Sequence, residues 1–198
     1  MADAKISALT ALTGANVAPL SDVLPIVDTN VTTTKKILVS ELSQAMFVLG
    51  TEQASTSGTA IDFTGIPAWA KEITIMFAGV STNGTSRLWL LLGDAGGFET
   101  TGYVSGASDS AGDTSQTAAL VLVNAVLAAG TLSGRIVLSL EDSSDFTWVS
   151  SGILATVAGV VNVSAGYKAT SAALTQIRIT TANGTDTFDA GAINISYR

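Results

Sequence analysis

Short runs in which apolar and polar residues alternate are the feature that most constrains how this chain of 198 residues can fold. Between Lys71 and Phe77 every second residue is large and apolar, namely Ile73, Ile75 and Phe77. A period of two places such side chains on one face of a β-strand, because successive residues of a strand point to opposite faces. A comparable run begins at Ala60. Four others cover Leu132–Leu140, Phe146–Ser150, Leu174–Thr180 and Ala192–Arg198.

Seven to nine strands at short spacing, with no long helical period, predict a mainly β fold. The arrangement that suits this pattern best is an antiparallel β-sandwich of jelly-roll type, with a closed barrel as the alternative. Arg87–Leu92 is apolar on both faces, so we expect it at the centre of a sheet.

Turn signals predict how these strands are connected. The Asn83-Gly84 and Asn183-Gly184 dipeptides favour hairpin turns, and the first would join the strands of a Lys71–Leu92 hairpin. Gly93–Thr117 is rich in Gly, Ser and Asp, which indicates a long surface loop with at most a short strand near Gly102–Ser105. Two apolar segments complete the β region. Ala118–Ala129 suits either a buried strand or a short buried helix, and Ile153–Val163 reads as β with a bulge at Gly159.

The first forty residues differ from the rest, because their apolar residues come in short, separated groups. The segment Lys5–Leu42 has too few of them to close a core of its own, so it packs either on its own domain or on another molecule. Short strands are predicted at Val23–Val27 and Thr32–Val39, and a short helix from Glu41 to Phe47 or Val48. The predicted organisation is an arm over residues 1–50, a linker over 51–59 and a β-domain over 60–198.

Composition narrows the function. Charged residues make up 13% of the chain and the net charge is -7, so nothing favours binding to nucleic acid or to an anionic membrane. No apolar run reaches the ~20 residues of a membrane helix, so no membrane insertion is expected. Histidine and cysteine are absent, which excludes imidazole- and thiolate-based catalysis and metal sites. Carboxylate chemistry, such as a glycosidase pair, remains open, but the acids are few and lie beside Ser- and Gly-rich turns rather than in apolar settings that raise a pKa. We therefore expect a protein that is not an enzyme and takes no cofactor.

Two weaker signals remain for ligands. The acidic run Glu141–Asp145 could hold Ca²⁺ but is better explained as a solvated turn, and Asp109 and Asp113 have the same explanation. Trp69, Trp89 and Trp148 could line a sugar-binding groove, although aromatic residues at alternating strand positions belong more often to a core. A carbohydrate-binding or glycan-degrading β-sandwich is thus the alternative to a structural protein.

The arm carries three motifs, KISALTALTG (5–14), DVLPIVD (22–28) and TKKILVSEL (34–42). Together they resemble the N-terminal segment of tailed-bacteriophage virion proteins of the tail-fibre, head-fibre and decoration kinds, and the region from Ile66 onward resembles the β-rich distal domain of such proteins. The resemblance implies a virion appendage that assembles in the host bacterial cytoplasm. Its expected partners are other copies of itself as a homotrimer, other virion proteins of the tail or capsid, and a host surface glycan. The residues expected to dock on the virion are Ile6, Leu9, Leu12, Leu24, Ile26 and Val27.

Overall fold

A computed structural model describes residues 23–27, 34–38, 47–124, 126–128 and 130–198. The chain divides into two compact units, residues 1–48 and residues 49–198. Each unit is described by itself below.

The described part of the first unit contains an antiparallel pair of strands, β1 (Val23–Val27) and β2 (Thr34–Leu38). Both predicted strands of the arm are thereby confirmed. The helix predicted from Glu41 begins outside the described residues. Where the description resumes, Phe47 lies in a bend and Val48 begins a strand, and no helix occurs in the described part of the chain.

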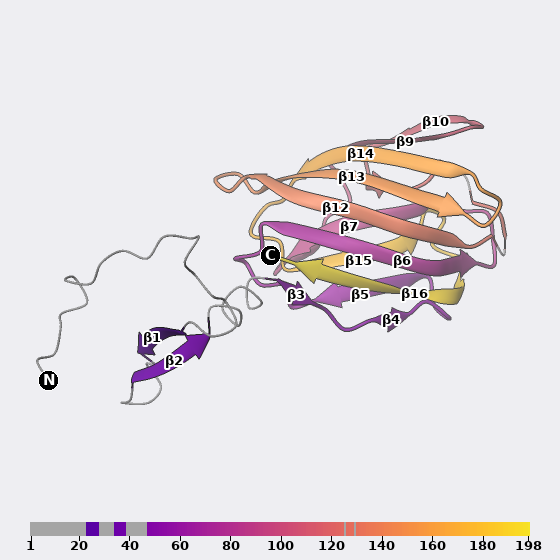
Figure 1. Ribbon diagram of the computed structural model, residues 1–198. Coiled ribbons are helices and arrows are strands. Elements are labelled where there is room, and N and C mark those ends of the chain that lie inside the picture. The colour runs from indigo at the N-terminus through magenta and orange to yellow at the C-terminus, as the bar shows by residue number, and fades with distance from the viewer. Residues whose placement is uncertain (1–22, 28–33, 39–46, 125, 129) are drawn as a thin grey trace, which may run out of the picture. The chain divides into compact units, whose positions relative to one another are not determined.

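The second unit holds two antiparallel sheets, which Figure 1 shows one behind the other. The larger sheet has nine strands in the order β10-β9-β14-β13-β12-β6-β16-β3, with β4 paired to β16 beside that path. Its strands are β3 (Val48–Leu49), β4 (Gln53–Ala54), β6 (Glu72–Thr82), β9 (Val104–Asp109), β10 (Gly112–Gln116), β12 (Leu132–Asp142), β13 (Thr147–Thr156), β14 (Val161–Ala169) and β16 (Phe188–Tyr197).

The smaller sheet has five strands in the order β11-β7-β15-β5, with β8 paired to β7. Its strands are β5 (Ala60–Thr64), β7 (Leu88–Asp94), β8 (Gly97–Phe98), β11 (Leu120–Val121) and β15 (Gln176–Thr181). β7 lies between its neighbours and is buried along most of its length, as its two apolar faces predict.

One hydrophobic core draws side chains from both sheets. The predicted alternation is confirmed: Ile73 and Ile75 of β6 are fully buried, whereas Glu72, Thr74 and Met76 are half-buried. In the smaller sheet, Ile177 and Ile179 of β15 are fully buried as well. The core members among the described side chains lie between Ile61 and Ile195. Burial of these aliphatic groups is the main force that holds the second unit together.

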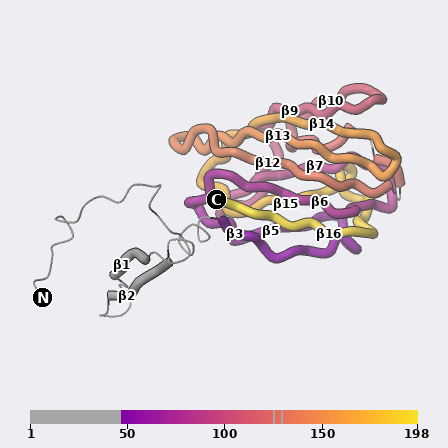
Figure 2. Tube along the Cα trace, in the orientation of Figure 1, coloured from indigo at the N-terminus to yellow at the C-terminus, as the bar shows by residue number. Residues whose placement is uncertain are grey.

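Both predicted hairpins are wrong in the same way. β6 pairs with β12 and β16 in the larger sheet, whereas β7 pairs in the smaller sheet, so the Asn83-Gly84 turn crosses between sheets. The Asn183-Gly184 turn likewise connects β15 of the smaller sheet to β16 of the larger (Figure 2). An Asn-Gly turn specifies a tight reversal of the backbone, but the burial of each strand decides with which sheet it pairs.

The two crossing turns hold each other through reciprocal hydrogen bonds. The N–H of Asn83 donates to the carbonyl of Thr187 (3.0 Å), and the N–H of Thr187 donates to Oδ1 of Asn83 (2.8 Å). The N–H of Ser86 donates to Oδ2 of Asp186 (2.9 Å), and the N–H of Asn183 donates to Oγ of Ser86 (3.0 Å). The turns therefore close one end of the core as a single bonded assembly.

The long loop predicted over Gly93–Thr117 is also wrong, because it contains β8 and an antiparallel pair, β9 and β10. β9 and β10 are built largely from Gly, Ser, Ala and Asp, which have low strand propensity. Their stability comes from pairing instead, since β9 also bonds to β14 at the edge of the larger sheet.

Two further segments differ from the sequence prediction. In Ala118–Ala129 the described residues form only the two-residue strand β11, followed by buried irregular chain through Leu122 and Val123. Ile153–Val163 is not one strand with a bulge. It is the end of β13, a turn and the start of β14, and Gly159 lies in that turn with a φ of 81°.

The crossing turns yield a stability prediction for Gly84→Ala. A Cβ at Gly84 would lie 2.0 Å from Oδ2 of Asp186, so the substitution displaces that carboxylate and its bonds to Ser86 and Asn183. We expect Gly84→Ala to lower the free energy of unfolding by about 2–3 kcal/mol, measured by urea denaturation.

The matched control is Gly65→Ala, where φ is 75° and nothing lies within 4 Å of the added Cβ. Backbone strain alone should then cost about 1 kcal/mol. Equal losses in the two variants would contradict the role assigned to the contact with Asp186.

Candidate interaction sites

The structure places half of the predicted docking residues. Leu24, Ile26 and Val27 lie on β1, and their Cα partners across the pair are Ile37, Lys35 and Thr34 of β2. Ile6, Leu9 and Leu12 lie outside the described residues. Three of the six candidates are therefore brought onto one strand of the first unit, and the backbone pairing of that strand is with the other strand of the same unit.

The acidic run Glu141–Asp145 forms a turn between β12 and β13 that is bonded within itself. Oδ1 of Asp142 accepts from the N–H and the hydroxyl of Ser144, each at 2.7 Å. Oδ1 of Asp145 accepts from the N–H and the hydroxyl of Thr147, at 3.1 and 2.7 Å. Within the described residues, no cluster of three or more Asp, Glu, His or Cys side chains could hold a metal ion. The contacts fit the turn explanation of this run.

Hydrogen bonds lower the pKa of several described carboxyl groups. The side-chain amide of Asn124 lowers the pKa of Asp109, the backbone N–H of Ser144 that of Asp142, and the side-chain amide of Asn183 that of Asp186. A general acid needs the opposite shift, because it must keep its proton near neutral pH. These groups are arranged as fixed ionised acceptors in turns.

A buried charge cluster joins the β7–β8 region of the smaller sheet to the end of β14 in the larger sheet. The Nζ of Lys168, a residue that is 7% exposed, forms an ion pair with Glu99 and lies 5.5 Å from the ring centroid of Tyr103. Oε1 of Glu99 accepts from the N–H of Ser171 (2.6 Å), and the hydroxyl of Ser171 donates to Oδ2 of Asp94 (2.6 Å). Sequence reasoning missed this cluster because its members are far apart in the chain and resemble ordinary loop and strand residues.

The environment of the cluster shifts three pKa values. The hydroxyl of Ser171 and the N–H of Gly96 lower the pKa of Asp94. Burial by itself would raise the pKa of Glu99, but Lys168 and Ser171 together hold it below its ordinary value. Burial raises the pKa of Tyr103 to about 12. The cluster therefore holds two ionised carboxylates, and it ties the β8 region to the chain that follows β14.

The three tryptophans have three different environments. Trp148 is buried in the hydrophobic core, and Trp89 is partly buried and packs against that core. Both therefore agree with the explanation that these aromatic residues belong to the core. Trp69 instead is 51% exposed, and its ring lies 5.7 Å from that of Tyr197 at an interplanar angle of 58°. Tyr197 lines a cleft of about 350 Å³ together with Asp62 and residues of the 49–53 segment. Asp62 is fixed there by two bonds from Arg178, at 2.7 and 2.6 Å.

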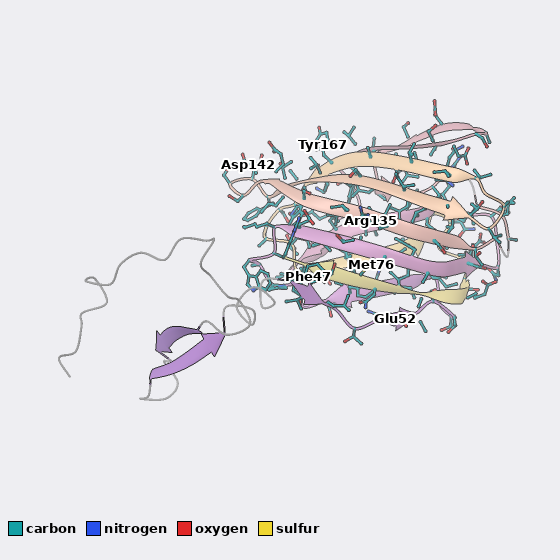
Figure 3. All side chains as sticks on the ribbon, viewed as in Figure 1. Phe47, Glu52, Met76, Arg135, Asp142 and Tyr167 are labelled. Atoms are coloured by element: carbon teal, nitrogen blue, oxygen red, sulfur yellow. The ribbon has the colours of Figure 1, made fainter. Side chains whose placement is uncertain are left out.

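The outer face of the larger sheet exposes a group of large apolar side chains over β9, β13 and β14, from which Figure 3 labels Tyr167. Sequence reasoning missed this group because the residues look like core positions of buried strands. Its members are Val104, Val149, Ile153, Val161, Val163 and Tyr167.

Comparison with protein-family models, with curated proteins and with solved structures finds no match for this chain. In the described part of the chain no helix is long and apolar enough to cross a membrane.

The charge cluster predicts acid sensitivity. In the folded state the pKa values of Asp94 and Glu99 lie below their ordinary values of 3.8 and 4.5. As the pH falls, these two groups therefore bind more protons in the unfolded chain than in the folded chain. The stability that these groups supply is present above those ordinary values and is lost as the pH drops through the folded-state values.

We expect Glu99→Gln to lower the free energy of unfolding at neutral pH by about 2–3 kcal/mol, because it leaves the Lys168 ammonium buried without its counter-charge. It should also flatten the loss of stability between about pH 5 and pH 3. Urea denaturation across this range measures both effects. The control is Glu141→Gln at the exposed end of β12, and the prediction fails if the two variants have the same pH profile.

Proposed function

We propose that this chain is a non-enzymatic structural protein of a tailed-phage virion. It is a fibre-type appendage docked by its N-terminal arm, and its β-domain faces outward as an antiparallel β-sandwich of jelly-roll type. The observation that carries the proposal is the division of the chain into two units, in which β1 pairs with β2 and the β-domain has a core of its own. The docking residues are Ile6, Leu9, Leu12, Leu24, Ile26 and Val27.

The surface of the β-domain supports an assembly role. Charged residues are only 13% of the chain, and six large apolar side chains are exposed on one sheet face. Monomeric proteins in free solution usually carry more charge and smaller apolar patches. Copies of the chain would associate three at a time, as the resemblance of the arm implies. The same features suit a capsid decoration protein, which is the first alternative to a fibre.

The docking role predicts that deletion of residues 1–42 leaves the β-domain folded but absent from virions. The deletion retains β3 and every described core member, so the unfolding midpoint should change by no more than about 2 °C. Mass spectrometry of purified virions should detect the full chain and not the truncated one. Normal occupancy of the truncated chain would contradict the proposal.

A pair of point variants tests the arm without a deletion. Leu24→Asp with Ile26→Asp should reduce occupancy in virions more than tenfold, because each change removes an apolar anchor of about 1.5–3 kcal/mol. Thr34→Ser on β2, the Cα partner of Val27, is the matched control and should leave occupancy unchanged.

The environment of Trp69 favours carbohydrate binding as a second function. An exposed aromatic ring beside a cleft with a fixed carboxylate is suited to a sugar, which stacks its apolar face and hydrogen-bonds its hydroxyl groups. A host surface glycan would then be the ligand of the outward domain.

On a glycan array, Trp69→Ala should abolish any signal that the full chain gives, because the stacking surface is lost. Tyr167→Ala is the control, since Tyr167 is equally exposed but lies on the outer face of β14. A signal that survives Trp69→Ala would exclude this cleft. A chain that is monomeric at micromolar concentration and binds glycans would favour the carbohydrate-binding alternative over the assembly role.

A further inference from the structure

The large exposed apolar residues on the outer face of β9, β13 and β14 lie in two cross-strand rows. Val104, Tyr167 and Val149 are cross-strand neighbours on β9, β14 and β13, and Val163 pairs with Ile153 four residues further along. Between these two rows lies a row of small residues, Gly106, Ala165 and Ser151. The exposed fractions of the five large side chains run from 39% to 58%. A patch of this kind on a soluble domain indicates a surface that another molecule covers.

A single row of cross-strand partners runs through this face, with opposite charges on either side of an apolar middle; beyond β12 the row continues through Met76 of β6. On the β10 side the row ends in Asp113, and four strands away it reaches Arg135 of β12; both side chains are exposed. Between them the row holds Ser108, Val163 and Ile153. Val163 is the middle member, two strands from either charge. The middle of the row is therefore apolar, and charges of opposite sign lie at equal distances, two strands, to either side of Val163.

We propose that a second copy of this chain covers this face, packed face to face across a two-fold axis that passes near Val163 along the strand direction. Such an axis reverses the row, so that Arg135 of each copy lies over Asp113 of the other and the contact has two ion pairs. Val163 then meets its own equivalent. A face that meets itself in this way makes a closed, isologous contact.

The shape of the surface fits the same arrangement. A shallow hollow of about 320 Å³ lies over β9, β10 and β14, lined by the small residues Gly106, Ser108 and Ala165 beside Val163. Reversal of the row places Ile153 of the second copy over Ser108, which is over this hollow. The large side chains of β13 in one copy thus oppose the small ones of β9 in the other.

Charge and area also favour a second copy as the occupant. The chain as a whole has a net charge of -7, so two copies repel each other unless they meet through a neutral patch. The row supplies one, because Arg135 and Asp113 cancel. The five strands β10, β9, β14, β13 and β12 together hold 41 residues. With a rise of about 3.3 Å per residue and a strand spacing of about 4.8 Å, they cover roughly 650 Å². A stable interface buries about 800 Å² per partner.

This pairing goes beyond the proposed virion role and is separable from it. A two-fold contact relates copies in pairs, whereas the association implied by the arm relates three. If both occur, the assembly contains an even number of chains.

Sedimentation equilibrium of the full chain tests the pairing. The expected mass is an even multiple of the 20.0 kDa chain. Ile153→Lys should raise the dissociation constant at least about 100-fold, because it places a charge in the apolar centre of the contact. Val157→Lys is the matched control: Val157 is 78% exposed but lies in the turn after β13, and this variant should associate like the unmodified chain. Circular dichroism of both variants confirms that they fold.

A charge swap tests the geometry. Arg135→Glu should weaken association about tenfold, and adding Asp113→Lys should restore it. Four results would overturn the pairing: a monomer at about 100 µM, a trimer only, unchanged association of Ile153→Lys, or no rescue by the double variant. None of them bears on docking by the arm, which is measured by occupancy in virions.

Discussion

Burial of aliphatic side chains from two sheets in one core is the interaction on which the rest of the second unit depends. Ile73 and Ile75 enter this core from the larger sheet, and Ile177 and Ile179 enter it from the smaller. Because the chain crosses between the sheets at both Asn-Gly turns, neither sheet is complete without the other. The larger sheet has nine strands and the smaller sheet has five. The outer face of the larger sheet presents the exposed apolar residues of β9, β13 and β14 to the surroundings.

Among the described residues, three ion pairs lie within the second unit. Lys168 pairs with Glu99, Arg178 with Asp62 and Arg198 with Glu72. Other carboxylates accept hydrogen bonds that fix turns, as Asp142 and Asp186 do. Much of the surface is therefore built from neutral residues, which limits repulsion between acidic chains that associate. A surface with few free charges is consistent with the proposed assembly role, in which copies of an acidic chain lie against one another.

Sequence patterns predicted strand identity better than strand partners. Alternation at Ile73–Phe77 fixes which face is buried, because burial of one face is a local property of the strand. The partner of a strand is a global property, so the turn at Asn83 was misread as a hairpin. β10 was missed, and β9 was expected only as a short strand near Gly102–Ser105, because pairing rather than propensity stabilises them: β9 pairs with β14 and β10 with β9. The cluster around Lys168 depends on Glu99, 69 residues earlier, and no local sequence pattern predicts such a contact.

Of the predicted docking residues, Leu24, Ile26 and Val27 lie on a predicted strand, and their docking role stays a prediction.

The most direct test of the proposed virion role is a low-resolution reconstruction of phage particles purified from cells that express this chain. The account predicts density of the size of the β-domain at symmetry-related positions on the outside of the particle, joined to the tail or capsid by the N-terminal unit. Purified virions without such density, or with the β-domain against the particle and the N-terminal unit directed outward, would contradict it.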